Sequence, residues 1–401
     1  MRLLYVSHSF PPANRPLSNV GGMQRVATEL YRALARRNDI QLEALVLRSS
    51  WRWTHVRVIP FMIRVLYRLS RLGRTHEVDL VLFSSMVTAA LAIPFRRRFK
   101  RMGIQTAAIV HGRDVTMPVG VYQRLVGRIF AALDLILPIS EAVEHECMKR
   151  GAQAGQIRRI PNGIDLSRYD LLLDRESARI RLQELMGRQL SDDALVLCSV
   201  GRQVRRKGFA WFAEFVLPRL PEQVVYVLAG DGPEGQAIQE AARRAGTTSR
   251  LFMIGRVDEA DLGAVYRGSD LFVMPNIPIP GDMEGFGVVM LEAGVNGLPT
   301  VASALEGIKD VIRPGVNGHL LEPMDAAAFA DAIMEYVDER SRLDVAASRA
   351  RVHVRDTFGW EAVADRYIGT LATLLPLNRR PAGTVLPLAA QPVRAVAEQV
   401  G

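Results

Sequence analysis

Short apolar runs alternate with longer segments of mixed polarity along most of the chain. The first half contains runs typical of buried strands at residues 3–7, 41–47, 80–83, 106–110, 135–138 and 157–160. Segments between them, such as residues 23–37 and 86–101, are predicted helices. Alternation of this kind predicts a parallel sheet with helices on both faces.

The same alternation restarts near residue 194 and predicts a second domain. Its predicted strands lie at residues 194–200, 224–229, 251–254, 271–274 and 300–302. A charged segment at about residues 166–193 separates the two series and suits a linker. The 401 residues are enough for two hydrophobic cores. We therefore expect an α/β fold of two doubly wound, Rossmann-like domains, residues 1–185 and 186–357, with a flexible tail at residues 376–401.

Basic charge is concentrated in the first half of the chain. The formal net charge is +9, whereas residues 1–185 alone contain 29 Lys and Arg against 15 Asp and Glu. Cys147 and Cys198 have no metal-ligand or C-x-x-C spacing, which favours a reducing compartment over a disulfide-stabilised fold. No apolar run reaches the length of a membrane span, and the first residues are typical of a strand. We expect a cytoplasmic protein.

The most basic stretch, residues 48–101, contains 12 basic and 2 acidic residues. Within residues 51–74, arginines at helical spacing accompany an apolar stripe; these are Arg64, Arg68 and Arg71, and Phe61, Val65, Leu69 and Leu72. Two interpretations stay open. In the first, residues 51–74 and the basic run at residues 96–101 contact an anionic membrane surface, and the protein is peripheral on the inner face of the membrane. Alternatively, the stripe packs onto the domain and leaves a solvated arginine face. No nucleic-acid-binding motif accompanies the charge, so we expect no nucleic-acid partner.

The stretch from Glu284 to Glu292 carries the most informative chemistry. Gly285, Phe286 and Gly287 form a turn that leads directly into an apolar helical segment. Backbone N–H groups uncovered at a helix start, together with the helix dipole, bind electron-rich oxygens. Glu284 can accept hydrogen bonds from sugar hydroxyls there, and Glu292, two turns deeper, can reach a diol such as ribose. Alone, the pattern also fits an acidic helix start with a solvated glutamate.

A basic turn follows the first predicted strand of the second domain. It places Arg202 and Lys207 five residues apart, between Gly201 and Gly208. Arginine supplies a planar fork and lysine a point charge, so the pair suits a pyrophosphate. A solvated basic turn is the alternative.

Two further turns follow strands of the first domain. Gly21 and Gly22 precede the predicted helix at residues 23–37, and His111 follows the strand at residues 106–110, with Asp114 three residues later. Alone, the glycines fit an ordinary turn and the histidine a structural role. Ligands bind at the carboxyl ends of strands in such sheets, so all these turns can meet in one interdomain cleft.

The ordered combination of these turns resembles the retaining glycosyltransferases of family 4, which carry the E-x7-E signature. The resemblance covers about residues 1–375. It implies the GT-B fold, in which two Rossmann-like domains face a deep interdomain cleft. Residues 1–185 would bind the acceptor and residues 186–357 the donor. The last long helix, about residues 358–375, would cross back to the first domain.

The resemblance also implies site residues. The expected catalytic residues are His111, Arg202, Lys207 and Glu284, and the expected donor-binding residues are Gly21, Gly22, Arg202, Lys207, Val257, Glu284, Gly285, Phe286, Gly287 and Glu292. In this assignment Val257 contacts the base through its backbone, and His111 contacts the sugar or the acceptor. No cofactor is expected, because the nucleotide-diphosphate sugar is a co-substrate. No metal is expected, because Arg202 and Lys207 bring the charge that a metal would supply.

The implied reaction moves a hexose from a UDP- or GDP-sugar to an acceptor hydroxyl. The Gly-Gly-Met-Gln block at residues 21–24 is similar to that of mannosyltransferases acting on lipids, which favours GDP-mannose slightly. The basic segment favours a lipid-linked or anionic glycan acceptor. The alternative is a GT-B sugar phosphorylase or a pseudo-glycosyltransferase acting on a soluble metabolite. A nicotinamide-dependent oxidoreductase is disfavoured, because no G-x-G-x-x-G follows the first strand.

Overall fold

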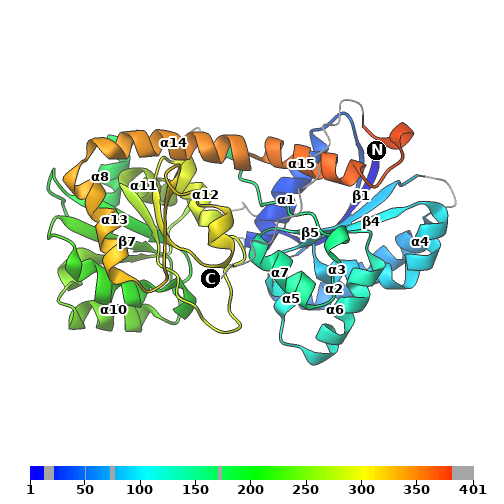
Figure 1. Cartoon of the computed structure of the whole chain (residues 1–401), viewed down its shortest axis with the longest axis horizontal. Helices are drawn as coiled ribbons and strands as arrows, with labels where there is room; N and C mark the ends of the chain where they lie inside the picture. Colours follow the sequence, from blue (N-terminus) through cyan, green and yellow to red (C-terminus); the bar gives the residue numbers. More distant parts are fainter. Residues whose placement is uncertain (13–21, 50, 73–76, 170–173, 382–401) are drawn as a thin grey trace, which may run out of the picture.

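Two domains lie side by side along the long axis of the molecule (Figure 1). The computed structural model describes residues 1–12, 22–49, 51–72, 77–169 and 174–381, without the side chains of residues 22 and 51–55. Helices α14 (Ser341–Phe358) and α15 (Trp360–Ala372) run along one side of both domains.

Each domain is built on one parallel sheet. The orders are β2-β1-β3-β4-β5 and β11-β10-β9-β6-β7-β8. The strands of the first sheet are β1 (Arg2–Phe10), β2 (Gln41–Arg48), β3 (Leu80–Phe83), β4 (Gln105–Val110) and β5 (Leu135–Pro138). Those of the second are β6 (Leu195–Val200), β7 (Val224–Ala229), β8 (Leu251–Gly255), β9 (Leu271–Met274), β10 (Thr300–Ser303) and β11 (Gly318–Leu321). Strands β3 and β7 are buried along their whole length, as expected when helices cover both faces of a parallel sheet.

Helices connect consecutive strands in both domains. The N-terminal domain contains α1 (Gly22–Ala35), α2 (Trp51–Arg71), α3 (Met86–Ala89), α4 (Arg96–Met102), α5 (Arg113–Thr116), α6 (Gly120–Ala132) and α7 (Glu141–Lys149). The C-terminal domain contains α8 (Arg175–Met186), α9 (Phe209–Trp211), α10 (Gly235–Arg244), α11 (Glu259–Gly268), α12 (Val288–Val295) and α13 (Ala326–Asp338). The predicted α/β architecture of two Rossmann-like domains is confirmed.

Two local predictions need correction, and one strand was missed. The strand predicted at residues 157–160 is wrong, because Ile157 forms only an isolated bridge with Ile136. The helix predicted at residues 86–101 is divided into α3, a 3-10 helix (Ala90–Phe95) and α4. Pro94 lies in that 3-10 helix, and proline cannot donate the hydrogen bond of a continuous α-helix. Strand β11 was not predicted.

The segment predicted as a linker, residues 166–193, contains α8, which packs against α11 of the C-terminal domain. Arg181 on α8 donates through Nε to Asp261 on α11 (2.8 Å). The C-terminal domain therefore begins near Asp174, which caps α8, and earlier than the predicted boundary at residue 185.

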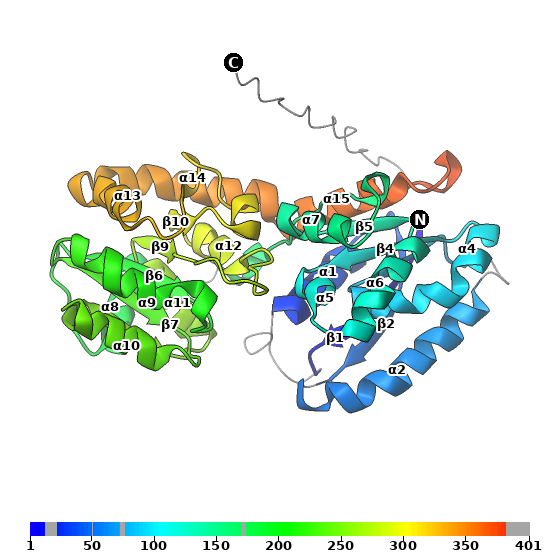
Figure 2. The same cartoon turned by 60° about the horizontal axis from the view of Figure 1, so that its bottom comes forward.

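Two stretches of chain cross between the domains side by side. The Ile164 N–H donates to the Phe358 carbonyl (2.8 Å), and the Trp360 N–H donates to the Ile164 carbonyl (3.2 Å). Beyond this crossing, α15 packs against α1 of the N-terminal domain (Figure 2). Of the tail predicted to be flexible, residues 376–381 are described and contain a 3-10 helix (Leu377–Arg379); the prediction for residues 382–401 lies outside the described residues.

Trp360 fastens this crossing to the N-terminal domain. Its Nε1 donates to Glu29 on α1 (2.6 Å), and its ring lies directly over Gly163. A Cβ built on Gly163 would lie 2.5 Å from Cδ2 of the indole, so a side chain at residue 163 has no room.

Replacing Gly163 by alanine is expected to destabilise the protein by about 1–3 kcal/mol, because the added methyl group overlaps the indole of Trp360. Urea unfolding followed by tryptophan fluorescence measures this change. Gly120→Ala is the matched control, since nothing lies within 4 Å of a Cβ there. Equal stability of the two variants would contradict this packing.

Candidate active site

The turn after β4 is held in place by a buried carboxylate. Asp114 accepts hydrogen bonds from the backbone N–H groups of His111 (2.9 Å) and Met86 (3.2 Å). Burial raises the pKa of Asp114, and the nearby His111 and these N–H groups oppose that shift. Asp114 is therefore a positioning residue that fixes the His111 turn. The His111 Nε2 lies 3.0 Å from the Ser84 carbonyl oxygen, which can only accept, so Nε2 carries a proton.

Two cations converge on Glu284. Lys207 donates through Nζ to Glu284 Oε2 (2.6 Å), and Arg206 donates through Nη1 to the same oxygen (2.9 Å). Burial would raise the pKa of Glu284, but the charges of Lys207 and Arg206 outweigh it, and the net shift is downward. Burial lowers the pKa of Lys207, while Glu284 opposes that shift. The Glu284 carboxylate is thus ionised and fixed in one orientation.

Glycines permit the close packing that brings this basic turn to Glu284. Gly208 has a φ of +67°, and a Cβ there would lie 1.9 Å from the Pro275 carbonyl oxygen. Gly230, in the turn after β7, approaches Gly201 equally closely, with 2.1 Å from a built Cβ to the Gly201 carbonyl oxygen. The turns after β6, β7 and β9 therefore press together at one edge of the sheet.

The predicted glycine turn starts α12 and touches the opposite domain. Gly287 has a φ of +80° and immediately precedes the helix, and no described side chain caps it. A Cβ on Gly285 would lie 2.9 Å from the His111 carbonyl oxygen. The Phe286 side chain is buried against Phe358, with ring centroids 6.0 Å apart, so only its backbone can serve a ligand. The structure therefore brings His111 and the start of α12 together.

Glu292 is not open to solvent. Its side chain is only 4% exposed and pairs with Arg25 on α1 of the other domain. Tyr266 donates its hydroxyl proton to the second carboxylate oxygen (2.8 Å). The carboxylate predicted to hold ribose hydroxyls is thus occupied by partners from both domains.

The remaining predicted donor-binding residues are Arg202, Val257, Gly22 and Gly21. Arg202 is exposed and lines a cavity of about 290 Å³ between the domains, together with Arg113 and Arg206. Val257 follows β8 and packs against the hydrophobic core. Gly22 is the first residue of α1, and Gly21 lies outside the described residues.

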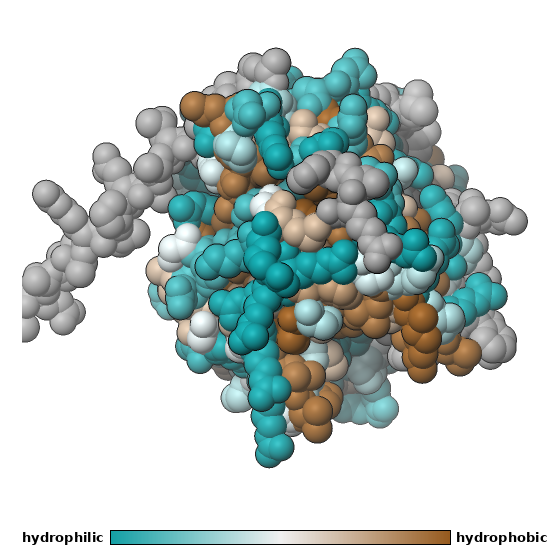
Figure 3. Space-filling view, turned by 90° about the vertical axis from the view of Figure 1, so that its right-hand side faces the viewer, coloured by the Kyte–Doolittle hydropathy of each residue, from teal (hydrophilic) through white to brown (hydrophobic). Residues whose placement is uncertain are grey.

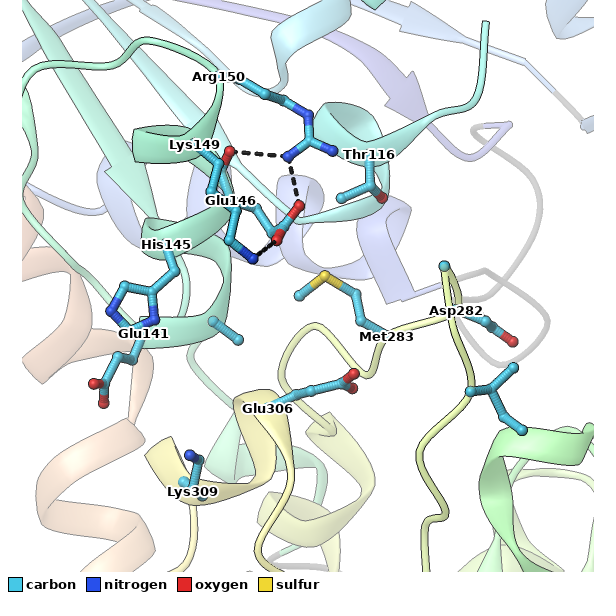
Figure 4. Close-up of a pocket in the computed structure, with 13 residues that line it drawn as sticks. Thr116, Glu141, His145, Glu146, Lys149, Arg150, Asp282, Met283, Glu306 and Lys309 are labelled. Atoms are coloured by element: carbon cyan, nitrogen blue, oxygen red, sulfur yellow. Dashed lines mark hydrogen bonds and ion pairs between the residues drawn. The ribbon is translucent and has the colours of Figure 1, made fainter.

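A larger cavity of about 460 Å³ lies between α7 and the loop that precedes Glu284 (Figure 4). Both domains contribute polar side chains to it, among them His145, Lys149, Asp282 and Glu306. Figure 4 shows Glu306 extending from the C-terminal domain toward the middle of this space. Its carboxylate accepts the Glu284 backbone N–H, and its φ of +45° is unusual for a residue other than glycine. Burial raises the pKa of Glu306, and the backbone N–H opposes this shift.

Sequence reasoning missed five residues of this site. They are His8, Arg25, Arg206, Tyr266 and Glu306. Arg206 adjoins Lys207 in a visible basic run, and Arg25 lies one helical turn after Gly22, so both carried a weak signal. The positive φ of Glu306 and the hydrogen bond from Tyr266 to Glu292 depend on tertiary contacts, so the sequence carried no signal for either residue.

Within the described ranges, no group of three or more His, Cys, Asp or Glu side chains could hold a metal ion. The search of the same ranges for a helix long and apolar enough to span a membrane also found none.

Two Rossmann-like domains whose loops meet in a cleft define the GT-B architecture. The structure is similar to that of HepE from Anabaena in complex with UDP, with a TM-score of 0.68, 19% identity, and coverage of 93% of this chain and 100% of that one. Residues 20–168 match the family described as Glycosyltransferase Family 4, and residues 194–339 match Glycosyl transferases group 1. The chain belongs to glycosyltransferase family 4, which confirms the predicted family and the GT-B fold.

Named relatives are glycosyltransferases as well. The chain is 30% identical over 287 residues to a D-inositol 3-phosphate glycosyltransferase of Xylanimonas cellulosilytica, over 70% of this chain and 65% of that one. It is 25% identical over 398 residues to a GDP-mannose-dependent alpha-(1-6)-phosphatidylinositol monomannoside mannosyltransferase of Mycolicibacterium smegmatis, over 94% of this chain and 99% of that one. The protein is therefore a glycosyltransferase.

His8, near the end of β1, gives the stability of the fold a measurable pH response. Burial, with a smaller contribution from the charge of His111, lowers the pKa of His8 to about 4 from an ordinary value of 6.5. The unfolded chain binds this proton more readily, so protonation favours unfolding. Stability is full above pH 6.5 and falls as the pH approaches 4.

We expect the free energy of unfolding to fall by about 2 kcal/mol more in the wild type than in His8→Gln between pH 6.5 and pH 4. Urea unfolding at several pH values measures the difference. His145→Gln, which removes an exposed histidine, is the control and should keep the wild-type slope. An unchanged slope in His8→Gln would contradict the assignment.

Proposed function

We propose that the protein is a retaining, metal-independent hexosyltransferase that uses a nucleotide-diphosphate sugar. One observation carries the proposal. The ionised Glu284, fixed by Lys207 and Arg206 just before α12, adjoins Gly285, whose backbone contacts the His111 turn of the other domain. A carboxylate, two cations and a free helix start can together hold sugar hydroxyls and a diphosphate.

In the donor complex, Arg202 and Lys207 hold the diphosphate, and α1 begins at Gly22 beside it. Glu284 and the N–H groups of Phe286 and Gly287 hold the sugar. Glu292 takes the ribose hydroxyls in place of Arg25, and the backbone at Val257 contacts the base. The name of the mycobacterial relative favours GDP-mannose slightly, whereas the similar HepE structure contains UDP, so both nucleotide classes belong in the test.

The transfer breaks the bond between C1 of the sugar and the phosphate oxygen. The acceptor oxygen forms a new bond to C1 on the same face, and its proton passes to the departing phosphate. Arg202 and Lys207 stabilise the negative charge that develops on the phosphate. His111 binds the sugar or the acceptor at the opposite wall of the cleft. Arg202 and Lys207 thus supply the positive charge for which other transferases use a metal ion.

The acceptor enters on the N-terminal side, through the 460 Å³ cavity that Glu306 faces. Carboxylates in this cavity suit hydroxyl groups, and Lys149 and Lys309 suit an anionic group. The names of these two relatives refer to inositol 3-phosphate and to phosphatidylinositol monomannoside. We infer a lipid-linked or anionic glycan acceptor, reached from the cytoplasmic face of a membrane. The alternative is a sugar phosphorylase or a pseudo-glycosyltransferase that acts on a soluble metabolite.

A panel of UDP- and GDP-sugars should reveal one nucleotide class that raises the melting temperature, because a ligand that binds the folded state stabilises it. At a ligand concentration of 100 Kd the gain is about 2.7 kcal/mol. Glu292→Gln should lose most of this shift, whereas Glu214→Gln, in an exposed ion pair with Arg244, should retain it. No shift with any nucleotide sugar would contradict the proposal.

Donor hydrolysis, the transfer of the hexose to water, should be unaffected by EDTA. Lys207→Met should lower its rate by about 10²–10³-fold, because a charge that stabilises the leaving diphosphate is lost. Arg206 still pairs with Glu284 in that variant, so the fold is expected to persist, and circular dichroism checks this. A loss of activity in EDTA that Mg²⁺ restores would overturn metal independence but not the donor site.

A further inference from the structure

Helix α2 has two apolar faces, and only one of them packs against the domain. The stripe singled out in the sequence is the buried one: its four side chains are at most 7% exposed, and they are Phe61, Val65, Leu69 and Leu72. This packing confirms that the stripe serves the core. This face of α2 is therefore not the one that could contact a membrane.

A second apolar stripe lies on the opposite side of α2 and faces solvent. Val56, Ile59, Ile63 and Tyr67 are 66%, 65%, 62% and 60% exposed. Their spacing of three, four and four residues aligns them along one face of the helix. Single exposed apolar residues are ordinary, but a continuous row along a helix marks a surface that docks onto something.

Basic residues border this stripe along its length. Arg57, Arg64 and Arg71 are exposed and recur every seven residues, so they form a row beside the apolar one. The Arg71 guanidinium lies over the Tyr67 ring, 4.9 Å from its centroid. The sequence of α2 contains no acidic residue.

Helix α4 extends the same basic surface. Arg98 donates to the Leu72 carbonyl at the end of α2 (3.0 Å), which ties the two helices together. The exposed basic residues of α4 are Arg96, Arg97, Lys100 and Arg101. Figure 2 shows α4 beside one end of α2, which forms the outer edge of the domain. Figure 3, which faces this end of the molecule, shows exposed hydrophobic surface beside long hydrophilic side chains.

The helix that carries the stripe begins at the carboxyl edge of the first sheet. Strand β2 ends at Arg48, at the carboxyl edge of the sheet where the site lies, and α2 begins at Trp51. The helix then runs back along the domain, away from the cleft. Strands β2 and β5 are at opposite ends of this sheet, so the start of α2 shares the carboxyl edge with the cavity beside α7 but does not line it.

We propose that α2 docks onto an anionic lipid bilayer through Val56, Ile59, Ile63 and Tyr67, with Arg57, Arg64 and Arg71 at the headgroups. A convex helix with one apolar and one basic row suits the boundary between headgroups and acyl chains. A second copy of the chain fits poorly, because it would bring two basic rows together without acidic partners. The lipid-linked acceptor of the proposed function would explain why the protein binds a bilayer. The binding itself requires neither donor nor acceptor.

Flotation with vesicles tests the docking without any sugar nucleotide. The full-length protein should bind phosphatidylcholine vesicles that contain about 30% phosphatidylglycerol, and bind pure phosphatidylcholine at least about tenfold more weakly. Ile59→Ser with Ile63→Ser, and separately Arg57→Gln with Arg64→Gln and Arg71→Gln, should each reduce the partition coefficient at least about tenfold. Val345→Ser with Val352→Ser, exposed apolar positions on α14, is the matched control and should bind as the wild type does.

Three outcomes would overturn the docking: no binding to anionic vesicles, equal loss in the α14 control, or wild-type binding by the α2 variants. A smaller sedimenting mass in Ile59→Ser with Ile63→Ser than in the wild type would assign the stripe to self-association instead. The donor-induced thermal shift should be the same in all these variants. A missing donor shift together with intact vesicle binding would refute the proposed function and leave the docking surface standing.

Discussion

Buried charge is the constraint on which the cleft depends. A carboxylate removed from water costs several kcal/mol unless a cation or a set of donors compensates it. Glu284 is compensated within its own domain by Lys207 and Arg206, whereas Glu292 is compensated by Arg25 from across the cleft. The domains are therefore joined here by an ion pair, and water or a ligand can replace either partner of an ion pair more readily than it can replace a packed apolar contact.

The proposed function therefore requires the Arg25–Glu292 ion pair to separate when the donor binds. In this structure Arg25 occupies the carboxylate to which the proposed function assigns the ribose hydroxyls. A ribose diol that displaces Arg25 must donate hydrogen bonds to the Glu292 carboxylate in place of the guanidinium. The displaced Arg25 then needs another anionic partner, which the donor diphosphate can supply. The nearby crossing at Trp360 is held by packing on Gly163 and by the hydrogen bond to Glu29, whose carboxylate also feels the charge of Arg25.

The sequence was sufficient for the features that repeat or that lie next to each other in the chain. Apolar runs located most strands, and the two turns that end in Gly208 and Gly287 were visible because glycine is required at their positive φ. It failed where a neighbour distant in sequence decides the outcome. Nothing in the local pattern shows that Arg25 meets Glu292, or that residues 157–160 find too few partners to form a strand. The roles given to Arg202, Lys207 and Val257 stay predictions, because position at the correct edge does not establish contact with a ligand.

Helix α2 is a second case in which the local sequence pattern does not show the tertiary contacts. The sequence identified one apolar stripe, Phe61 to Leu72, and a basic character, but a helical period alone cannot say which apolar face meets the sheet. Because that stripe packs in the core, the opposite face of the helix is left in solvent beside arginines. Its apolar side chains are Val56, Ile59, Ile63 and Tyr67. A helix that needed only to cover the sheet would gain solubility from polar residues at those four positions. Their apolar character therefore points to a contact outside the chain.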